Sequence, residues 1–214
     1  MTENIAAFAY LLSSFLFIMA LRGLSSPETA RSGNVFGIIG MLIAIVTVLF
    51  DKYEMGWEII LIGMGIGAVI GLFAAIKVEM TQMPQLVAIF NGFGGGASAL
   101  VAASEFLKSW EKGSLNQLDF LTISIALSVL VGTLTFTGSF IAFGKLQGFV
   151  SSKPITFLGQ QIFNAILLII ILCATYLIPT YGTTSLISII LLSALLGILL
   201  VIPIGGADMP VVIS

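Results

Sequence analysis

Few side chains of this chain could do chemistry, and the most unusual of them lies inside an apolar run. The stretch from Met83 to Glu105 is long enough to cross a bilayer and carries the carboxamide of Asn91 near its middle. Hydrocarbon offers that amide no hydrogen-bond partner. On a helix, one face would combine small and polar residues, namely Asn91, Gly95, Ser98, Ala102 and Glu105. We expect this face to meet protein or water, either in tight helix packing or along a polar pathway.

A second polar stripe follows in the apolar run 118–143. Hydroxyl-bearing and small residues recur on one helical face there, at Ser124, Ser128, Gly132, Thr135 and Ser139. Hydroxyl groups can satisfy backbone carbonyls of their own helix, and they can equally line water. Both interpretations stand for Ser128 and Ser139.

The third candidate is the segment Gly205-Gly206-Ala207-Asp208-Met209-Pro210. Asp208 is a good N-cap, and Pro210 suits the first turn of a new helix. Gly205 and Gly206 give the backbone freedom to change shape. Because an ionised carboxylate here stays hydrated, we expect Asp208 to cap a helix or to contact a partner domain, not to carry a proton within the bilayer.

Composition places these residues in a membrane protein. Of 214 residues, 58% are hydrophobic and 8% are charged, whereas soluble domains are about 25% charged. The eight basic and ten acidic residues are scattered through short connections, which leaves no basic patch for a nucleic acid. Histidine is absent and Cys173 is the single cysteine, so we expect no metal site and no histidine relay within this chain.

The apolar runs predict an all-α polytopic membrane protein, a bundle of about seven transmembrane helices with the start of an eighth. The expected spans are 5–21, 35–50, 57–76, 83–105, 118–143, 157–177 and 184–202, with a tight turn at Pro179 to Gly182 before the last. A further helix begins at Pro210 and stops after one turn, so we expect the polypeptide to continue. Residues 1–214 then form one transmembrane domain, truncated at its C-terminal end.

The basic residues of alternate connections set the orientation. One side holds Arg22, Arg31, Lys77, Lys145 and Lys153, and the other holds Lys52, Lys108 and Lys112. This bias predicts an amino terminus outside and a cytoplasmic turn at Gly205 to Pro210.

The third expected span contains Gly63-Met64-Gly65-Ile66-Gly67-Ala68, which fits a dinucleotide-binding pattern. No strand is expected before it, so we interpret the match as accidental. Gly63, Gly67 and Gly71 recur every four residues and instead predict a groove for close helix packing.

Three stretches together resemble the membrane domain of the beta subunit of proton-translocating NAD(P) transhydrogenase. They are Met83–Ile89 with the glycines after it, Gly138–Gly148 and Gly205–Ser214. The resemblance is colinear over essentially the whole chain. It implies a membrane domain that couples proton passage to hydride transfer between NADH and NADP⁺, a reaction that takes place in soluble domains outside the bilayer.

The resemblance also implies the cofactors and partners. This chain itself would bind no cofactor and supply no catalytic residue, because NADP(H) and NAD(H) bind to soluble domains of the complete complex. The NADP(H)-binding domain would follow this chain in the same subunit, and the NAD(H)-binding domain would belong to the alpha subunit, which adds membrane helices. Two alpha-beta units would form a dimer in the inner membrane of a bacterium.

For the site, the polar helix faces and the resemblance together predict a proton pathway at Asn91, Ser98, Ser128 and Ser139, and a coupling turn at Gly205, Gly206 and Asp208. One position departs from the family pattern. Many members carry a histidine at the position of Asn91 as the proton relay, and asparagine does not titrate in the useful range. In some members with asparagine here, a histidine on a membrane helix of the alpha subunit compensates, and the glycine-rich run after Asn91 resembles theirs.

Two other functions fit the composition. A secondary transporter of a small solute would use glycine-interrupted helices and polar groups at mid-membrane, although its halves would be related, and this chain has no convincing internal repeat. A structural membrane subunit would use Asn91 and the hydroxyl stripe only for helix packing.

Overall fold

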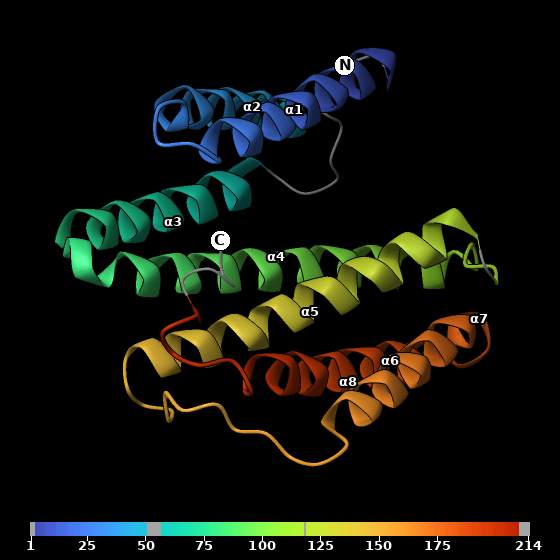
Figure 1. Cartoon of the computed structure of the whole chain (residues 1–214). Coiled ribbons are helices and arrows are strands. Elements are labelled where there is room, and N and C mark those ends of the chain that lie inside the picture. Colours follow the sequence, from blue (N-terminus) through green and yellow to red (C-terminus); the bar gives the residue numbers. More distant parts are fainter. Residues whose placement is uncertain (1–2, 51–56, 118, 210–214) are drawn as a thin grey trace. The chain divides into compact units, whose positions relative to one another are not determined.

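The computed structural model describes residues 3–50, 57–117 and 119–209, and the regular structure in these residues is entirely helical (Figure 1). The helices are α1 (Glu3–Leu24), α2 (Ala30–Phe50), α3 (Trp57–Lys77), α4 (Met83–Glu111), α5 (Phe120–Leu146), α6 (Gln160–Tyr176), α7 (Ile178–Tyr181) and α8 (Thr183–Val201). A short 3₁₀ turn, Met80–Gln82, precedes α4. The chain divides into two compact units, Met1–Phe73 and Ala74–Ser214.

The all-α polytopic fold class is confirmed. Six of the described helices are long and apolar enough to cross a membrane. The seventh expected span is α6, whose 17 residues lie near the lower limit of about 17 for a crossing. Helices suit this environment because each one satisfies its own backbone hydrogen bonds. The expected start of an eighth helix at Pro210 lies outside the described residues.

Several helix boundaries differ from the prediction; α2, for example, begins at Ala30 and not at residue 35. The helix that begins at Met83 runs to Glu111, six residues past Glu105, because Leu107, Lys108 and Glu111 still favour helix. The expected tight turn at Pro179 to Gly182 is instead a single helical turn, α7, with Pro179 in its first positions. Proline is tolerated there because the first helical N–H groups have no partner within the helix.

The first unit contains a hairpin of α1 and α2 that packs along small residues spaced seven apart. The buried positions are Ala6, Ser13 and Ala20 on α1 and Gly33, Gly40 and Thr47 on α2. The Ser13 hydroxyl donates to the Gly40 carbonyl at 2.7 Å. A seven-residue spacing of this kind is typical of a left-handed helix pair, and small residues let the two backbones approach.

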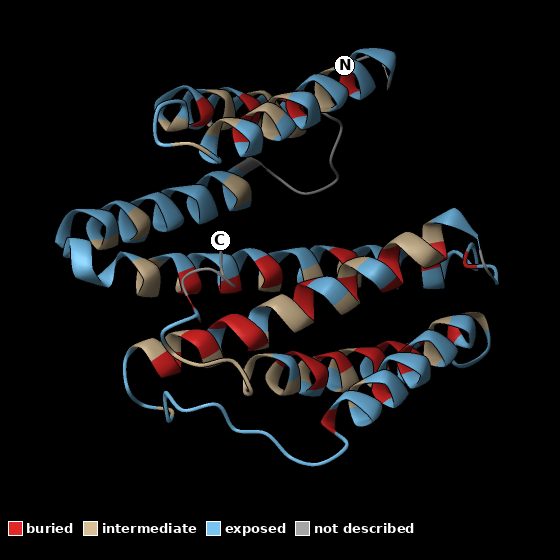
Figure 2. Cartoon of the chain, in the orientation of Figure 1, coloured by how far each residue is buried: buried red, intermediate tan, exposed pale blue. Residues whose placement is uncertain are grey.

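Helix α3 is exposed along almost its whole length (Figure 2). A Cβ atom added at Gly63, Gly67 or Gly71 would meet nothing within 4 Å in the described part of the chain. The packing of another helix into this glycine groove therefore stays a prediction.

The second unit places its four long helices in the order α4, α5, α8, α6 (Figure 1). Helix α5 contacts α4 on one side and α8 on the other, and it carries many of the buried residues (Figure 2). The apolar core includes Phe106 of α4, Val129 of α5, Ile171 of α6 and Ile189 of α8. Shielded on two sides, α5 is the helix around which this unit is built.

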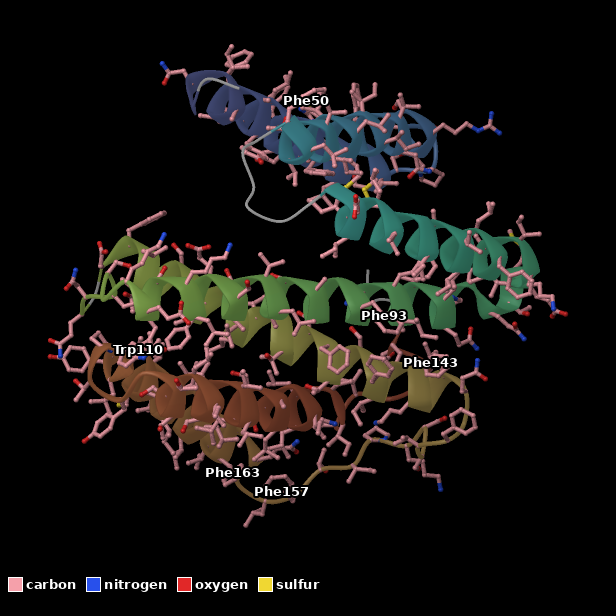
Figure 3. All side chains as sticks on the ribbon, turned by 180° about the vertical axis from the view of Figure 1, so that it is seen from behind. Phe50, Phe93, Trp110, Phe143, Phe157 and Phe163 are labelled. Atoms are coloured by element: carbon pink, nitrogen blue, oxygen red, sulfur yellow. The ribbon has the colours of Figure 1, made fainter. Side chains whose placement is uncertain are left out.

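Trp110 closes one end of the second unit, and Phe143 lies towards the other (Figure 3). The Trp110 ring stacks on Phe106, with ring centroids 6.0 Å apart. It also covers Gly182, which joins α7 to α8 with a φ of +51°. A Cβ atom at Gly182 would lie 2.3 Å from the indole ring, so both the backbone and the space require glycine.

Helices α4 and α5 come closest at Gly95 and Gly132. A Cβ atom on Gly132 would lie 2.6 Å from the Gly95 carbonyl oxygen, and one on Gly95 would lie 2.7 Å from the Gly132 carbonyl oxygen. The atoms in the way belong to backbone and cannot rotate aside. This crossing therefore depends on the absence of both side chains.

We predict that Gly132→Ala lowers the stability of the second unit by about 1–3 kcal/mol, because the added methyl group overpacks this crossing. Thermal unfolding of the complete protein in detergent, followed by circular dichroism, measures the effect. Gly94→Ala is the matched control, since a Cβ atom there meets nothing within 4 Å. Equal unfolding temperatures for the two variants would contradict the prediction.

Candidate functional site

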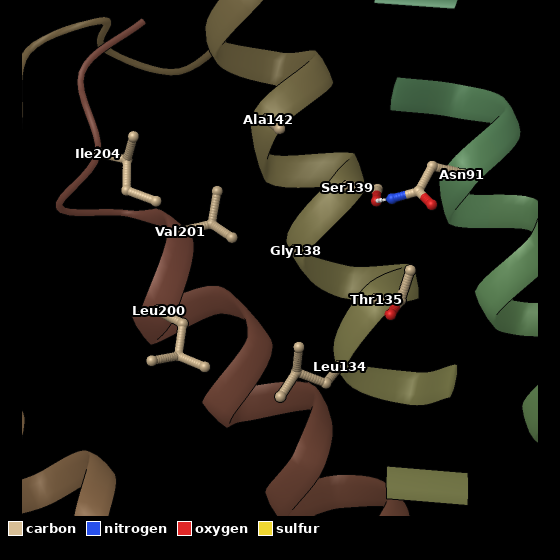
Figure 4. A pocket seen from close by; sticks show the side chains of 9 residues that line it. All are labelled: Asn91, Leu134, Thr135, Gly138, Ser139, Ala142, Leu200, Val201 and Ile204. Carbon is tan, nitrogen blue, oxygen red and sulfur yellow. Dashed lines mark hydrogen bonds between the residues drawn. The ribbon is translucent and has the colours of Figure 1, made fainter. Parts of the chain in front are cut away.

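Asn91 and Ser139 meet across the contact between α4 and α5. The Asn91 amide nitrogen donates to the Ser139 hydroxyl oxygen at 2.9 Å (Figure 4). Ser139 is buried at 6% exposure, while Asn91 is exposed at the edge of this chain. Gly92 allows the contact, because a Cβ atom there would lie 3.2 Å from that of Ser139. The two polar faces expected from the sequence thus face each other.

This pair lines a pocket of about 270 Å³, here called the Asn91 pocket. Its remaining walls come from α5 and from the end of α8 with the turn after it, and they consist of Leu134, Thr135, Gly138, Ala142, Leu200, Val201 and Ile204 (Figure 4). Most of the lining is apolar. Asn91, Thr135 and Ser139 are its polar side chains, so they alone can orient water in it by side-chain hydrogen bonds.

The contact leaves hydrogen-bonding capacity free in the pair. A carboxamide has one oxygen and two N–H groups, and a hydroxyl has one hydrogen and two lone pairs. The bond between Asn91 and Ser139 uses one amide hydrogen and one hydroxyl lone pair. The Asn91 oxygen can accept and the Ser139 hydroxyl can donate, so the pair can bind water at both ends without titrating.

Ser98 and Ser128 lie in a different pocket. This second pocket, of about 460 Å³, is here called the Glu105 pocket, and its polar lining consists of Ser98, Glu105, Ser124 and Ser128. Ser98 and Glu105 are exposed, and the two serines of α5 are half-buried. Four polar side chains of the two predicted faces are therefore gathered here, away from Asn91.

The crossing of Gly95 and Gly132 separates the two pockets. On α4, Gly95 lies between Asn91 and Ser98, which are about 10 Å apart along the helix axis. On α5, Gly132 likewise lies between Ser128 and Ser139. The four residues expected to form one pathway are thus brought together in two pairs, with two touching backbones between them.

Thr137, which is not on the predicted stripe, has carbonyls of its own helix within reach. Its single hydroxyl hydrogen has three possible acceptors: the Ala194 carbonyl of α8 at 2.9 Å is the nearest, and the Thr133 and Leu134 carbonyls of α5 are at 3.2 and 3.4 Å. Ser139, on the stripe, accepts from Asn91 instead. For Ser139 the structure therefore favours a role between helices.

Asp208, Gly205 and Gly206 lie in the turn that follows α8. Asp208 is exposed, and its backbone N–H donates to the Gly205 carbonyl at 3.0 Å. The Gly206 N–H donates to the Ser152 carbonyl at 2.9 Å. Neither glycine has a positive φ here, so glycine is not required by the backbone conformation in this state. The helix that Asp208 was expected to cap lies outside the described residues.

Lys145 is the residue that sequence reasoning missed. It was predicted only as a charge in a connection, yet it is 1% exposed at the end of α5. Its ammonium donates to the Ile202 and Ile204 carbonyls that follow α8. Its place inside the stretch Gly138–Gly148 was the one signal that could have found it.

Other candidates carry no chemistry in the described residues. The glycine pattern Gly63–Ala68 lies well inside α3 and not at a helix N-terminus after a strand, so it does not fit a dinucleotide. No group of three or more Cys, Asp or Glu residues in the described part of the chain could hold a metal ion. Cys173 is a free, exposed thiol on α6.

The fold and these pockets define a class, a polytopic helical membrane protein with polar groups between its helices. The family model of the NAD(P) transhydrogenase beta subunit matches residues 6–214. The chain belongs to the NAD(P) transhydrogenase beta subunit family, as the three sequence stretches predicted.

Two curated relatives support the assignment. Both are called NAD(P) transhydrogenase subunit beta and come from Rhodospirillum rubrum, and each is 43% identical over 218 residues. The alignments cover 100% of this chain and 47% of each relative. The chain thus spans about half the length of the curated relatives that it matches.

We predict that Asn91 and Ser139 stabilise the protein together. Asn91→Ala and Ser139→Ala should each lower the free energy of unfolding, and the double variant should lose less than the sum, with a coupling of about 0.5–1.5 kcal/mol for one hydrogen bond. Thermal unfolding in detergent of the unchanged protein, the two single variants and the double variant completes this double-mutant cycle. Additive losses would show that the contact contributes no energy.

Proposed function

We propose that this chain is part of the proton-conducting membrane domain of a transhydrogenase, in which proton passage is coupled to hydride transfer between NADH and NADP⁺. The observation that carries the proposal is the Asn91 to Ser139 contact, which lines a pocket large enough for water, in a chain of the transhydrogenase beta subunit family. A purely structural subunit would need the contact but not the pocket. A solute transporter has no support from the family match.

In this proposal Asn91 and Ser139 hold water for a proton and do not take the proton themselves. The Asn91 pocket has room for several water molecules, each occupying about 30 Å³. Ser98 and Ser128 serve the same purpose in the Glu105 pocket. This chain has no histidine, and our candidate for the titrating relay is a histidine on a membrane helix of the alpha subunit.

The proposal extends to partners and placement. NADP(H) binds to a domain that follows this chain in the same polypeptide, and NAD(H) binds to the alpha subunit, with two alpha-beta units forming a dimer. The membrane is a bacterial inner membrane. The amino terminus lies outside, so the Gly205 to Asp208 turn faces the cytoplasm, where Asp208 contacts the nucleotide-binding domains.

Asn91→Leu tests the proton role. In inside-out vesicles that contain the complete complex, we expect this variant to lower proton-linked transhydrogenation roughly tenfold, because the loss of one hydrogen-bonding group is worth about 1–1.5 kcal/mol. Proton movement across the vesicle membrane and hydride transfer between the two nucleotides are followed together.

Asn164→Leu is the matched control, since it removes an amide from α6 outside the Asn91 pocket. The control should leave coupled activity close to that of the unchanged complex. Normal coupling in Asn91→Leu would assign Asn91 to helix packing alone.

For the coupling turn, we predict that Asp208→Asn lowers proton-linked transhydrogenation about tenfold in the complete complex, in the range of typical coupling free energies. The substitution keeps a capping oxygen but removes the charge offered to the nucleotide-binding domains. Asp119→Asn, at the N-cap of α5, removes an equivalent exposed charge as a control. Full coupled activity with unaltered NADPH affinity in Asp208→Asn would reduce Asp208 to a structural residue.

A further inference from the structure

Lys145 is unusual because a charged side chain is buried there, between the end of α5 and the residues that follow α8. The side chain is 1% exposed, and its nitrogen donates to the carbonyl oxygens of Ile202 and, at 2.8 Å, Ile204. Ile202 is the C-cap of α8. The last carbonyls of a helix lack intrahelical donors and carry the negative end of the helix dipole, so a cation suits them.

The contacts of Lys145 continue into the turn that holds Asp208. The Ser152 hydroxyl donates to the Lys145 carbonyl at 3.3 Å, and the Ser152 carbonyl accepts from Gly206 at 2.9 Å. The Ile155 N–H donates to the Ile202 carbonyl at 3.3 Å. Backbone and side-chain bonds thus join three segments, the end of α5, the connection after it and the turn after α8.

The same bonds hold a wall of the Asn91 pocket. Val201 and Ile204 line that pocket, and Lys145 binds the carbonyl of Ile204 itself. Asp208 follows Ile204 by four residues. At the other end, Lys145 lies on the helix that carries Ser139. One buried ammonium therefore connects both sides of the pocket with the Asp208 turn.

We propose that Lys145 is a positioning residue that couples the Asp208 turn to the Asn91 pocket. By holding the carbonyls of Ile202 and Ile204, it makes the turn and the pocket wall move as one piece. When a nucleotide-binding domain shifts Asp208, the shift reaches Val201 and Ile204. This proposal rests on the proposed function and names the residue through which its two sites communicate.

Lys145→Met in the complete complex tests this role, because it keeps the apolar stem and removes the donors. We expect complex in normal amount, and a ratio of proton uptake to hydride transfer that is about tenfold lower. Lys145→Arg should recover most of the ratio, since a guanidinium also donates to two carbonyls. Lys153→Met, an exposed lysine in the following connection, makes the same charge change and should leave the ratio unaltered.

A cross-linking experiment tests whether Lys145 holds the Asp208 turn against Ser152, without any enzyme assay. A Cβ atom on Gly206 would lie 3.0 Å from that of Ser152, close enough for a Ser152→Cys and Gly206→Cys pair to form a disulfide after a small shift. With Cys173→Ala in the background, the yield on mild oxidation should be high in the parent and in Lys153→Met, and severalfold lower in Lys145→Met.

The outcomes separate the two proposals. Equal coupling ratios and equal cross-link yields for Lys145→Met and Lys153→Met would overturn the role of Lys145. A complex that transfers hydride without moving protons, while its cross-link still depends on Lys145, would overturn the proposed function alone. If the Lys145→Met complex fails to assemble, Lys145→Gln, which keeps two weaker N–H donors, replaces it in the same measurements. An unaltered coupling ratio and an unaltered cross-link yield in Lys145→Gln would overturn the proposal.

Discussion

The close approach of α4 and α5 at Gly95 and Gly132 is the constraint on which the second unit depends. Polar groups within a bilayer need partners from protein or trapped water. Two helices can supply them to each other only when their backbones nearly touch, and here each glycine faces the other's carbonyl oxygen. Four residues before Gly95, Asn91 then reaches the Ser139 hydroxyl. The crossing thus creates the contact and also limits how far a polar path can run.

Helix α5 transmits this constraint to α8. Gly197 of α8 packs against Leu134 and Thr137. A Cβ atom added to Gly197 would lie 2.5 Å from the Leu134 carbonyl oxygen. Thr137 bonds to the Ala194 carbonyl, and Lys145 binds the carbonyls after the helix end. α5 makes close contacts on two sides. A displacement at the end of α8 should therefore move α5, and Ser139 with it, more than it would in a loosely packed bundle.

Much of the fold follows from hydropathy and from the helical spacing of residues, and both can be read from the sequence. The helical faces of Asn91 and Ser139 were predicted because side chains three, four and seven apart share a face whatever the tertiary structure. The seven-residue spacing of Ala6, Ser13 and Ala20 is likewise visible in the sequence. The separation of Ser98 from Asn91 was not predictable, because it depends on where two helices cross. The burial of Lys145 was not predictable for the same reason, since the carbonyls that it binds lie 57 and 59 residues away in the sequence.

This chain has no histidine, which bears on the kind of coupling proposed for it. A titrating relay would couple by changing its affinity for a proton. Asn91 and Ser139 do not titrate in the useful range, so in the proposed function they act on a proton through the water that they orient. Water in a small, mostly apolar pocket responds to the position of its walls, and two of those wall residues, Val201 and Ile204, precede the Asp208 turn. In the proposed function, the nucleotide domains control the proton at this pocket through its shape, so the residues that hold the wall matter as much as those that can touch water.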